Sequence, residues 1–552
     1  MALLRRAGGA PDRERRGTRQ PLRPGGEPPR PLRHRRPSGT ARGRLATLRP
    51  PRPPAPALLP AGGRLILAAG REIAVQQLSG LDAAFLALES ATTPMHIGSA
   101  SILDPSLAGG GRLDLAHLRR VLAGRLGASR VFRQRLVEVP LGLGKPYWIE
   151  DPDFDLDRHL ERTRLPEPGG MRQLEALMSW ELSQPLPRDR PLWQMILVEG
   201  LERVPGVPPG SMAVIGKVHH AAIDGVSGAE IMGALFDLGP TPRPLPADPW
   251  EPEPEPGKLA LLRRAGRNLL AHPRLLRSTL AETAKGLARA GAAWALERIE
   301  PPPLPFTAPR TRWNAPLSKD RSWGGVAVSL ARIRAIKEAA SSGDDAVTVN
   351  DVVLAICAGA LRRFLAERDE LPDKPLIAMV PVSVRSADER GAMGNQVSAM
   401  LVDLATGESD AGARLKRIHR NTHRAKTHHR ALGARTLMDY SRIIPFSVAA
   451  LAARLYVGTG LAARHRPLFN LVITNVPGPR QPLYLAGARL LRHLGAGPIF
   501  DGMGLILAVM SYAGELSIGV TSCRRMLEDA SAFTRALEAS LDELEAAVLA
   551  PP

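Results

Sequence analysis

The chain has 552 residues, and its 74 lysines and arginines against 54 aspartates and glutamates give a formal net charge of +20. A chain of this length suffices for two or three domains, each with a buried core. Its two cysteines, Cys357 and Cys523, exclude a disulfide framework and a zinc site of four thiolates. No apolar run reaches the length of about 18 residues that crosses a bilayer, so an integral membrane protein is not expected.

The excess positive charge is concentrated in two segments. Residues 1–75 hold 17 Arg, no Lys and 4 acidic residues, and residues 258–299 hold nine basic and two acidic side chains. The rest of the chain has no net charge. A high isoelectric point is typical of nucleic-acid-binding proteins, but here the parts that are able to fold are balanced in charge. We therefore expect no nucleic acid partner.

The first 75 residues lack the means to form a hydrophobic core. They contain 13 Pro and no Phe, Trp or Tyr, a composition that is typical of disordered segments. Their apolar run, Leu65–Ala69, is too short and too late for the core of a secretory signal. We predict a disordered Arg/Pro-rich tail over residues 1–75. It is either a basic anchoring arm or an extension without function that reflects where translation was assumed to begin.

The first half of the chain alternates between predicted strands and helices. Period-two alternation predicts strands, and apolar residues three or four apart predict helices. Strands are expected at 95–104, 146–150, 192–198 and 212–218, and helices at 76–88 (after a turn), 113–126 and 171–183. A capping box, Ser227 with Glu230 three residues later, predicts a further helix at 228–238.

A proline-rich segment, residues 239–256, ends this half, because neither helices nor strands tolerate so many prolines. The second half begins near Trp323 and alternates in the same way. A capping box formed by Thr348 and Asp351 opens a long helix there. Other helices are expected at 331–340 and 526–548, and strands at 326–330, 376–384, 396–404, 468–474, 504–510 and 516–521.

Interleaved strands and helices in both halves are typical of α/β or α+β proteins, here with two similar-sized lobes. We predict an N-terminal lobe at residues 76–240, a Pro-rich and basic amphipathic linker at 241–322, and a C-terminal lobe at 323–552. Within the linker, leucines alternate with basic residues over 258–299, as in helices that lie on anionic membranes. An ordinary bridge between the lobes with one solvated face explains that pattern equally well.

One segment, KVHHAAIDG at residues 217–225, contains the residue types that general-base catalysis needs. A predicted strand delivers His219 and His220 into a loop, Asp224 follows, and Gly225 permits a tight backbone. Because successive side chains leaving a strand point in opposite directions, one histidine is expected to be the base and the other structural.

Three interpretations of this segment stay open on spacing alone. The first is a general base for acyl transfer, and the second is a metal site made of His219, His220 and Asp224. No second group of ligands stands at a matching strand end, which disfavours the metal site. The third is an accidental pair of histidines in a solvated loop.

Further motifs decide between these interpretations. HHAAIDG matches the HHxxxDG signature of acyl-CoA-dependent acyltransferases, and the chain as a whole resembles the bacterial wax ester synthase/diacylglycerol acyltransferase family. The motifs that carry this resemblance are QQLSGLDAAFL (76–86), TPMHIGS (93–99), FRQRL (132–136), YWIEDPDFDLDRHL (147–160), PLW (191–193), NDVVLA (350–355), PVSVR (381–385), GNQVS (394–398) and TNVPGP (474–479). The resemblance covers residues 76–548 and implies two lobes with the fold of chloramphenicol acetyltransferase.

By this resemblance, the protein is an enzyme that transfers a fatty acyl group from acyl-CoA to the hydroxyl of diacylglycerol or of a long-chain alcohol. His220 is the expected general base, and His219 supports it. Asp224 is expected to hold the loop through a salt bridge, and Gly225 to give backbone room. No cofactor and no metal are expected, since acyl-CoA is itself a substrate.

A second group of residues is expected to contact the substrates or to line their tunnel. Asn350 and Asp351 open a helix whose free amide groups favour anions, although capping that helix is an equally good role for them. Trp193 is expected to pack in the core and to shape the acyl channel. The full group is Trp193, Asn350, Asp351, Arg385 and Asn475.

Four histidines, at 419, 423, 428 and 429, require a separate interpretation. His419 and His423 are spaced i, i+4 on a predicted helix, a spacing that is able to bind a metal. Six basic residues and no carboxylate lie just before or among the four, namely Arg414, Lys416, Arg417, Arg420, Arg424 and Lys426. A solvated basic helix is therefore favoured over a metal site.

The expected partners are fatty acyl-CoA, the acceptor alcohol, and an anionic membrane or lipid-droplet surface. The protein is expected in the cytoplasm, peripherally attached to the plasma membrane or to lipid inclusions. Two other functions stay open, namely a non-catalytic lipid-droplet scaffold and acyl transfer to a non-lipid alcohol. The intact HHAAIDG segment argues against the scaffold, because a scaffold does not need a base.

Overall fold

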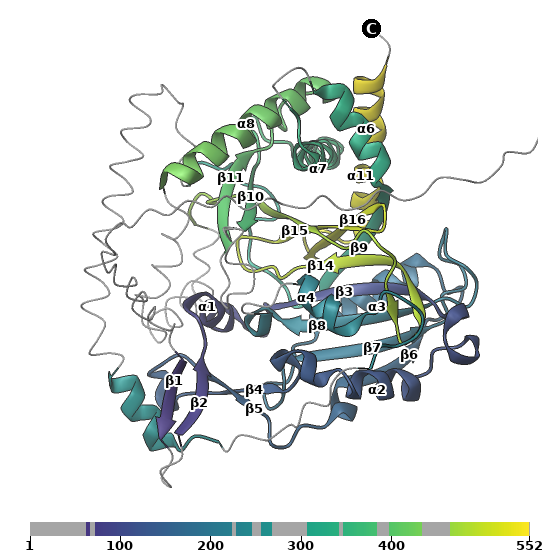
Figure 1. Ribbon diagram of the computed structural model, residues 1–552. Helices are drawn as coiled ribbons and strands as arrows, with labels where there is room; N and C mark the ends of the chain where they lie inside the picture. The colour runs from purple at the N-terminus through teal and green to yellow at the C-terminus, as the bar shows by residue number, and fades with distance from the viewer. Residues whose placement is uncertain are drawn as a thin grey trace, which may run out of the picture. The chain divides into compact units, whose positions relative to one another are not determined.

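The computed structural model describes residues 62–66, 72–223, 228–244, 255–267, 306–341, 346–383, 397–432 and 464–550. The strands in these ranges form two sheets of six strands and one of four, with helices packed against them (Figure 1). The predicted mixed α/β fold of two lobes is confirmed. Residues 1–61 and most of the predicted linker lie outside the described residues.

The first six-stranded sheet carries the two adjacent histidines at the end of β8. Its order is β13 (Tyr484–Leu485), β14 (Ala488–Ala496), β3 (His96–Asp104), β8 (Met212–His219), β7 (Trp193–Glu199) and β6 (Leu160–Arg164). Neighbouring strands are antiparallel except for β6 and β7. Both faces of the sheet are covered. Helix α3 (Met171–Ser183) packs on one face, and α2 (Leu115–Ala123) and α4 (Gly228–Leu235) pack on the other.

The second six-stranded sheet comes from the second half of the chain. Its order is β11 (Val397–Asp403), β10 (Ile377–Ser383), β12 (Leu471–Pro477), β15 (Leu505–Tyr512), β16 (Glu515–Cys523) and β9 (Arg321–Ser329). Four helices lie over it in Figure 1, namely α6 (Leu330–Ala340), α7 (Val349–Ala366), α8 (Ala411–Leu432) and α11 (Ala530–Leu549). They enclose the largest hydrophobic core of the described chain.

Helix α7 lies in the middle of that core because its sequence is apolar on nearly every side. The expected capping box opens it. The Thr348 hydroxyl accepts the backbone N–H of Asp351, and the Asp351 carboxylate accepts the backbone N–H of Thr348. This pair satisfies two amide groups that a helix start leaves without partners.

The four-stranded sheet has the order β1 (Gly62–Ile66), β2 (Glu72–Gln77), β5 (Tyr147–Glu150) and β4 (Gln134–Val137). Strand β2 leads into α1 (Gly80–Leu88), the helix predicted within residues 76–88. Strand β1 and most of β2 lie inside the segment for which composition predicted disorder. Backbone pairing does not require aromatic residues, and this is why composition missed these two strands.

Strand β14 connects the two halves of the chain. It belongs to the second half in sequence, yet it pairs with β3 of the first. It also passes close to β16, where any side chain at Gly519 would overlap the carbonyl oxygen of Gly495. Glycine is therefore required at this crossing. The sequence analysis did not predict β14, and the predicted domain boundaries remain predictions.

Helix α3 provides a second connection between the halves. Hydroxyl groups of Ser183 and Ser179 accept the backbone N–H groups of Arg321 and Trp323 in β9, each at 2.9 Å. The guanidinium of Arg321 donates to the backbone carbonyl of Thr92, in the loop that precedes β3. The edge strand of the second sheet is thus held beside the loop before β3, whose Met95 carbonyl accepts the backbone N–H of His220.

Most other predicted elements lie within a few residues of their expected positions, and α3 spans its expected range. The short strands β4, β6 and β13 were not predicted. None of the helices in the described part of the chain has both the length and the apolarity needed to cross a bilayer.

Candidate active site

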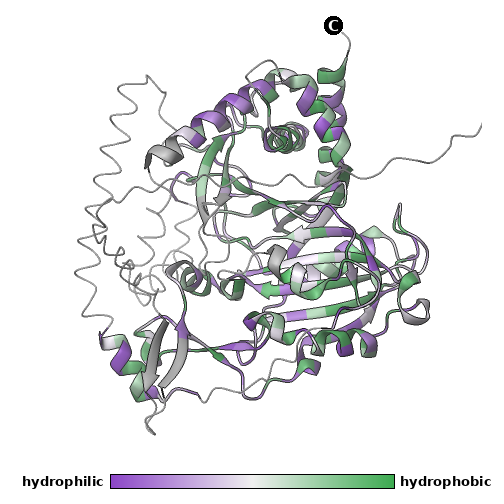
Figure 2. Cartoon of the chain, in the orientation of Figure 1, coloured by the Kyte–Doolittle hydropathy of each residue, from purple (hydrophilic) through white to green (hydrophobic). Residues whose placement is uncertain are grey.

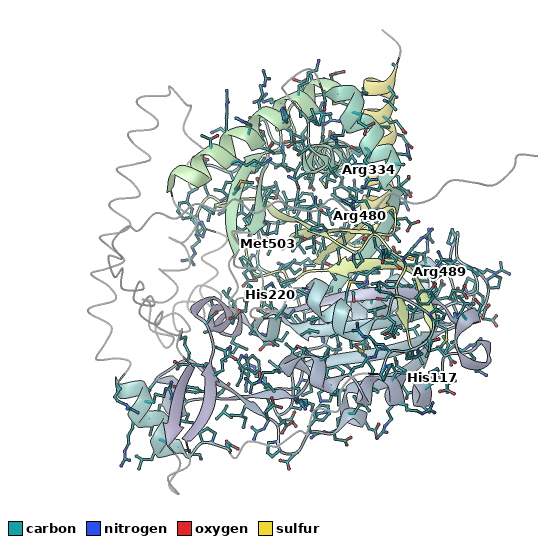
Figure 3. All side chains as sticks on the ribbon, in the orientation of Figure 1. His117, His220, Arg334, Arg480, Arg489 and Met503 are labelled. Atoms are coloured by element: carbon teal, nitrogen blue, oxygen red, sulfur yellow. The ribbon has the colours of Figure 1, made fainter. Side chains whose placement is uncertain are left out.

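His220 lies at the point where β8 ends and a 3-10 turn, η7 (His220–Ile223), begins (Figure 3). Its backbone N–H donates to the carbonyl of Met95 at 2.8 Å, one residue before β3. The backbone at His220 is therefore fixed by the neighbouring strand. Because His220 has already left β8, strand alternation does not decide where the two histidine rings point. The hydrogen bonds and ring contacts of each histidine decide this instead.

The imidazole of His220 stacks on the ring of Phe85 in α1, with ring centres 3.8 Å apart and planes 25° apart. Within the described chain, no other residue bonds to its Nδ1 atom. The ring interacts instead with the backbone carbonyl of His220 itself. A proton on the nitrogen that faces this carbonyl leaves the other ring nitrogen as an acceptor.

Burial lowers the pKa of His220 to about 4, and the nearby His219 adds to this effect, while the carbonyl contact opposes it. The imidazole is consequently neutral near pH 7 and has a free electron pair to accept a proton. The residue is only partly buried, so part of it remains accessible to a substrate. These are the properties of a general base.

His219 is fully buried, and its two ring nitrogens have different partners. Its Nδ1 accepts the backbone N–H of Ala221 at 3.1 Å, and its Nε2 lies 3.5 Å from Oε1 of Glu89. An accepting Nδ1 places the proton on Nε2, facing the carboxylate. His219 therefore connects the turn that carries His220 to the residue that follows α1.

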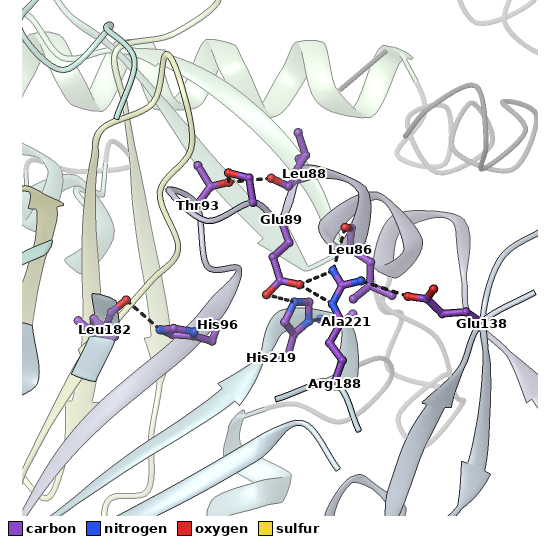
Figure 4. Close-up of polar contacts among 11 residues, drawn as sticks. Leu86, Leu88, Glu89, Thr93, His96, Glu138, Leu182, Arg188, His219 and Ala221 are labelled. Carbon is purple, nitrogen blue, oxygen red and sulfur yellow. Dashed lines mark hydrogen bonds and ion pairs between the residues drawn. The ribbon is translucent and has the colours of Figure 1, made fainter. Parts of the chain in front are cut away.

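Glu89 is the centre of a small charged network, shown in Figure 4. Its carboxylate also pairs with the guanidinium of Arg188, which reaches Glu138 at 3.2 Å. Burial alone would raise the pKa of Glu89, but the hydrogen bond from His219 and the charge of Arg188 outweigh burial and lower the pKa to about 2. Glu89 is therefore ionised across the physiological range of pH.

A third histidine, His96, lies opposite His219 in the pairing of β3 with β8. Its Nε2 bonds to the carbonyl of Leu182 at 3.2 Å, as Figure 4 also shows. Burial, followed by the charge of nearby Lys217, lowers the pKa of His96 to about 3. Lys217 itself is buried in an ion pair with Glu181 of α3, at 2.8 Å. His96 and Lys217 thus tie β3 and β8 to α3 next to the two motif histidines.

Trp193 occupies the core position expected for it. Its indole N–H donates to the carbonyl of Phe132, and its ring stacks on that of His159 with centres 4.4 Å apart. Three other predicted site residues, Asp224, Gly225 and Arg385, lie outside the described residues.

Asn350 and Asn475 are brought together from α7 and β12, with the side-chain N–H of Asn475 donating to Oδ1 of Asn350 at 3.3 Å. Asp351, by contrast, is fully buried and turned toward its own lobe. Besides capping α7, its carboxylate accepts hydrogen bonds from His419 at 2.9 Å and from the hydroxyl of Thr422. The structure therefore gives Asp351 the capping role.

The expectation of a solvated helix around the four histidines is correct for one face of α8 and wrong for the other. Lys416, Arg417 and His423 are exposed, but His419 and Arg414 are buried. The sequence contains no carboxylate near His419, since its partner Asp351 comes from another helix. Among the described residues, no group of three or more histidine, cysteine or acidic side chains is arranged to hold a metal.

The sequence analysis missed three residues that contact the histidine pair directly or through one partner: Phe85, Glu89 and Arg188. Phe85 lies in a helix and Glu89 follows its end, about 130 residues before the motif. The one available signal was an isolated glutamate in an otherwise apolar segment, AAFLALES. Only the pairing of β3 with β8 brings that segment to the histidines.

Comparison with known proteins shows the family to which the chain belongs. Residues 78–353 match the wax ester synthase/diacylglycerol acyltransferase catalytic domain, and residues 393–545 match the C-terminal domain of the same family. The chain belongs to the wax ester synthase/diacylglycerol acyltransferase family. It is therefore an acyltransferase, and the recognition made from its motifs is confirmed.

Individual relatives agree with this assignment. A protein of Mycobacterium tuberculosis, provisionally named a diacylglycerol O-acyltransferase, is 34% identical over 486 residues, or 85% of this chain and 91% of that protein. A Mycobacterium bovis protein with the same kind of name is 35% identical over 484 residues, or 85% and 98%. Among solved structures, the wax ester synthase/diacylglycerol acyltransferase of Marinobacter aquaeolei is 30% identical, with a TM-score of 0.58, over 85% of this chain and 99% of that one.

Proposed function

We propose that this acyltransferase moves a fatty acyl group from acyl-CoA to the hydroxyl of diacylglycerol or of a long-chain alcohol, with His220 as the general base. The relatives named above are called diacylglycerol acyltransferases or wax ester synthases, which supports both acceptors. The observation that carries the proposal is the partly exposed, neutral imidazole at the end of β8, stacked on Phe85.

In the proposed reaction, the acceptor hydroxyl gives its proton to the free nitrogen of His220 while its oxygen attacks the thioester carbonyl carbon. The resulting tetrahedral oxyanion collapses, and the bond between carbon and sulfur breaks. The CoA thiolate then takes the proton back from the imidazolium. One ester and one free CoA form, and the imidazole returns to its neutral state without a covalent enzyme intermediate.

Three contacts support the ability of His220 to act in this way. The Met95 carbonyl fixes its backbone, the Phe85 ring covers one face of its imidazole, and its own backbone carbonyl also interacts with the ring. Because these contacts already fix its orientation, the imidazole loses little conformational freedom when it enters the geometry of the reaction. His219 supports the same turn through its bond to the Ala221 amide and through its contact with Glu89.

The remaining site assignments stay proposals. We propose that Asp224 holds the loop and that Gly225 gives room for the substrates, as in the family pattern. Asn350 and Asn475 are proposed to approach the substrates from the second lobe, which their mutual hydrogen bond supports. Trp193 is proposed to shape the acyl channel from its place beside β8.

We also propose that the protein meets its acceptor at an anionic membrane or lipid-inclusion surface, to which it attaches peripherally from the cytoplasm. The water-insoluble acceptors support this location, and so does the basic amphipathic segment at 258–299.

The proposed reaction is tested with purified protein and palmitoyl-CoA, offered diacylglycerol and hexadecanol in parallel. Thin-layer chromatography of the lipid products and a thiol reagent for released CoA measure the two products independently. We expect equal amounts of ester and CoA with at least one acceptor. Turnover restricted to a non-lipid alcohol, or no turnover at all, would overturn the proposal, and the latter result would favour a scaffold.

A further inference from the structure

The connection between β4 and β5 exposes leucine side chains that the fold itself does not use. Leu141 is 87% exposed and Leu143 is 53% exposed. Leu141 also has a left-handed backbone conformation, with φ at 60°, inside the turn η5 (Pro140–Gly142). Glycine adopts this conformation without strain and leucine does not. Neither packing nor backbone preference within the described chain explains a leucine at this position.

A basic helix packs directly against this turn. In the described chain, residues 258–267 are helical, and Leu261 and Ala265 share a hydrophobic cluster with Val137 of β4, Tyr147 of β5 and Val139 of the connection between them. The guanidinium of Arg264 lies over the ring of Tyr147, 5.6 Å from its centre. The turn and the helix are therefore one packed unit.

The opposite side of this helix is both apolar and positively charged. Leu259 is 61% exposed, and Lys258, Arg263 and Arg267 are exposed as well. Residues 258–267 contain four basic side chains and no carboxylate. The helix is drawn in teal at the lower left of Figure 1, and Figure 2 shows that hydrophilic and hydrophobic residues alternate around it.

We propose that the β4–β5 turn and helix 258–267 form the surface through which the protein docks on an anionic lipid surface, with Leu141 and Leu143 entering the apolar layer. Isolated leucines at a turn, next to a helix with several cations, match what an interfacial anchor requires. A protein partner would instead require a continuous apolar patch with aromatic anchors. This inference rests on the proposed function only in taking the acceptor to be a lipid.

The two native cysteines make a site-specific test possible. Both Cys357 and Cys523 are buried, so a single cysteine introduced by Leu141→Cys accepts an environment-sensitive fluorophore such as NBD. The matched control is Leu107→Cys, since Leu107 is 55% exposed in another turn. Both labelled full-length proteins are mixed with vesicles of phosphatidylcholine, with and without phosphatidylglycerol.

We expect the fluorophore at position 141 to brighten and shift to shorter wavelength with the anionic vesicles, while that at position 107 does not change. High salt should reverse the response, because it screens the cations. An unchanged signal at position 141 in protein that sediments with the vesicles would overturn the proposal. Equal responses at both positions would do so too, since they would indicate unspecific adsorption.

Leu141→Gly separates docking from a structural role. Glycine relieves the left-handed backbone, so the thermal stability of the protein should rise or stay the same. Vesicle affinity should nevertheless fall, by about tenfold when Leu143→Asn is added. A fall in stability with unchanged vesicle affinity would show that the leucine serves the fold.

The charged part of the surface is tested with Arg263→Gln and Arg267→Gln together. Sedimentation with anionic vesicles should weaken about tenfold, and weak binding to neutral vesicles should not change. Acyl transfer to a water-soluble short-chain alcohol should continue at the wild-type rate in all these variants. Loss of that transfer in the unmodified protein would refute the proposed function alone, whereas unchanged vesicle binding in the variants would refute this inference alone.

Discussion

Two buried histidine–carboxylate pairs, one in each half of the chain, have similar chemistry and different surroundings. His219 faces Glu89 at 3.5 Å beside the end of β8, and His419 bonds to Asp351 at 2.9 Å between α8 and α7. Both carboxyl groups have a lowered pKa in spite of burial, because hydrogen bonds to the charged form outweigh the loss of hydration. The pairs differ in what lies next to them.

The pair in the first half adjoins His220, a neutral imidazole with some exposed surface. The pair in the second half is enclosed by Thr348, Thr422 and its own helices, and the Asp351 carboxylate bonds to groups of the same buried core. A buried histidine–carboxylate pair is therefore no sign of a reaction centre by itself. The accessible, unpaired group that it supports is the informative feature.

The largest effect on stability is expected for Asp351→Ala. The change removes the cap of α7 and leaves His419 and Thr422 without their acceptor, which should lower the free energy of unfolding by about 2–4 kcal/mol. Urea unfolding measures this loss. The rate constant kcat of the protein that remains folded should stay close to wild type, and a large fall in kcat with unchanged stability would place Asp351 in the active site.

Glu89→Gln is expected to act on the rate instead. The amide keeps the shape of the side chain, but it removes the charge that pairs with Arg188 and faces His219. The turn that carries His220 should lose its precise position, and kcat should fall about tenfold to a hundredfold. Steady-state kinetics measures this. If Glu89→Gln left kcat unchanged and lowered the free energy of unfolding as much as Asp351→Ala does, the proposed difference between the two pairs would be wrong.

Phe85→Leu should change the pH dependence of the reaction. Without the stacked ring, water reaches the His220 imidazole, and its pKa should rise from about 4 toward its ordinary value of 6.5. A histidine with a higher pKa becomes protonated, and inactive as a base, at a higher pH. In a plot of kcat/KM against pH, the acidic limb should therefore move to higher pH by about one pH unit or more.

The matched control for this change is Phe132→Leu, because the Phe132 ring packs against Trp193 rather than His220. It should lower stability without moving the acidic limb. If both variants shift the acidic limb of the kcat/KM profile, or if neither does, stacking by Phe85 does not determine the pKa of His220. Rescue by Phe85→Tyr, which restores a stacked ring, completes the comparison.

A partly buried carboxylate, Glu175 in α3, has no histidine among the groups that shift its pKa, and burial raises that pKa to about 7. It accepts the backbone N–H of Gly325 and lies near Arg172, Arg535 and Asp529. Since the folded state binds this proton more tightly than the unfolded state, the free energy of unfolding should fall as pH rises from about 4.5 to about 7.

This loss of stability should be about 1–2 kcal/mol, a value reduced because solvent partly screens the charge. Glu175→Gln should abolish it, since the amide does not titrate. Differential scanning calorimetry at pH 5 and at pH 8, on both proteins, measures it. We expect the variant to be more stable than wild type at the higher pH only. An equal stability gain at both pH values would mean that charge at position 175 is not the cause.

Local patterns in the sequence predicted much of the fold. Capping boxes and apolar spacing located α3 and α7, because their signals lie within a few residues of each other. Strand β14 was missed because its sequence, ARLLRHLGA, mixes basic and apolar residues and pairs with a strand almost 400 residues away. Strands β1 and β2 were missed because composition carries no information about backbone pairing.

The site shows the same limit. The motif predicted His219 and His220, and the family resemblance gave them roles. The residues that position them, Phe85 and Glu89, become neighbours only through the pairing of β3 with β8. Asp351 and His419 were each noticed in the sequence, but 68 residues separate them, and nothing in their local spacing pointed to a bond between them.

The most direct test of the central claim compares His220→Ala with His419→Ala in one assay of CoA release from palmitoyl-CoA. We expect kcat of His220→Ala to be about 10²–10⁴-fold lower than that of wild type, which is the usual contribution of a general base. Its unfolding midpoint should stay close to wild type. His419→Ala should show the reverse, a lower midpoint with nearly unchanged kcat. A folded His220→Ala protein that turns over near the wild-type rate would contradict the account.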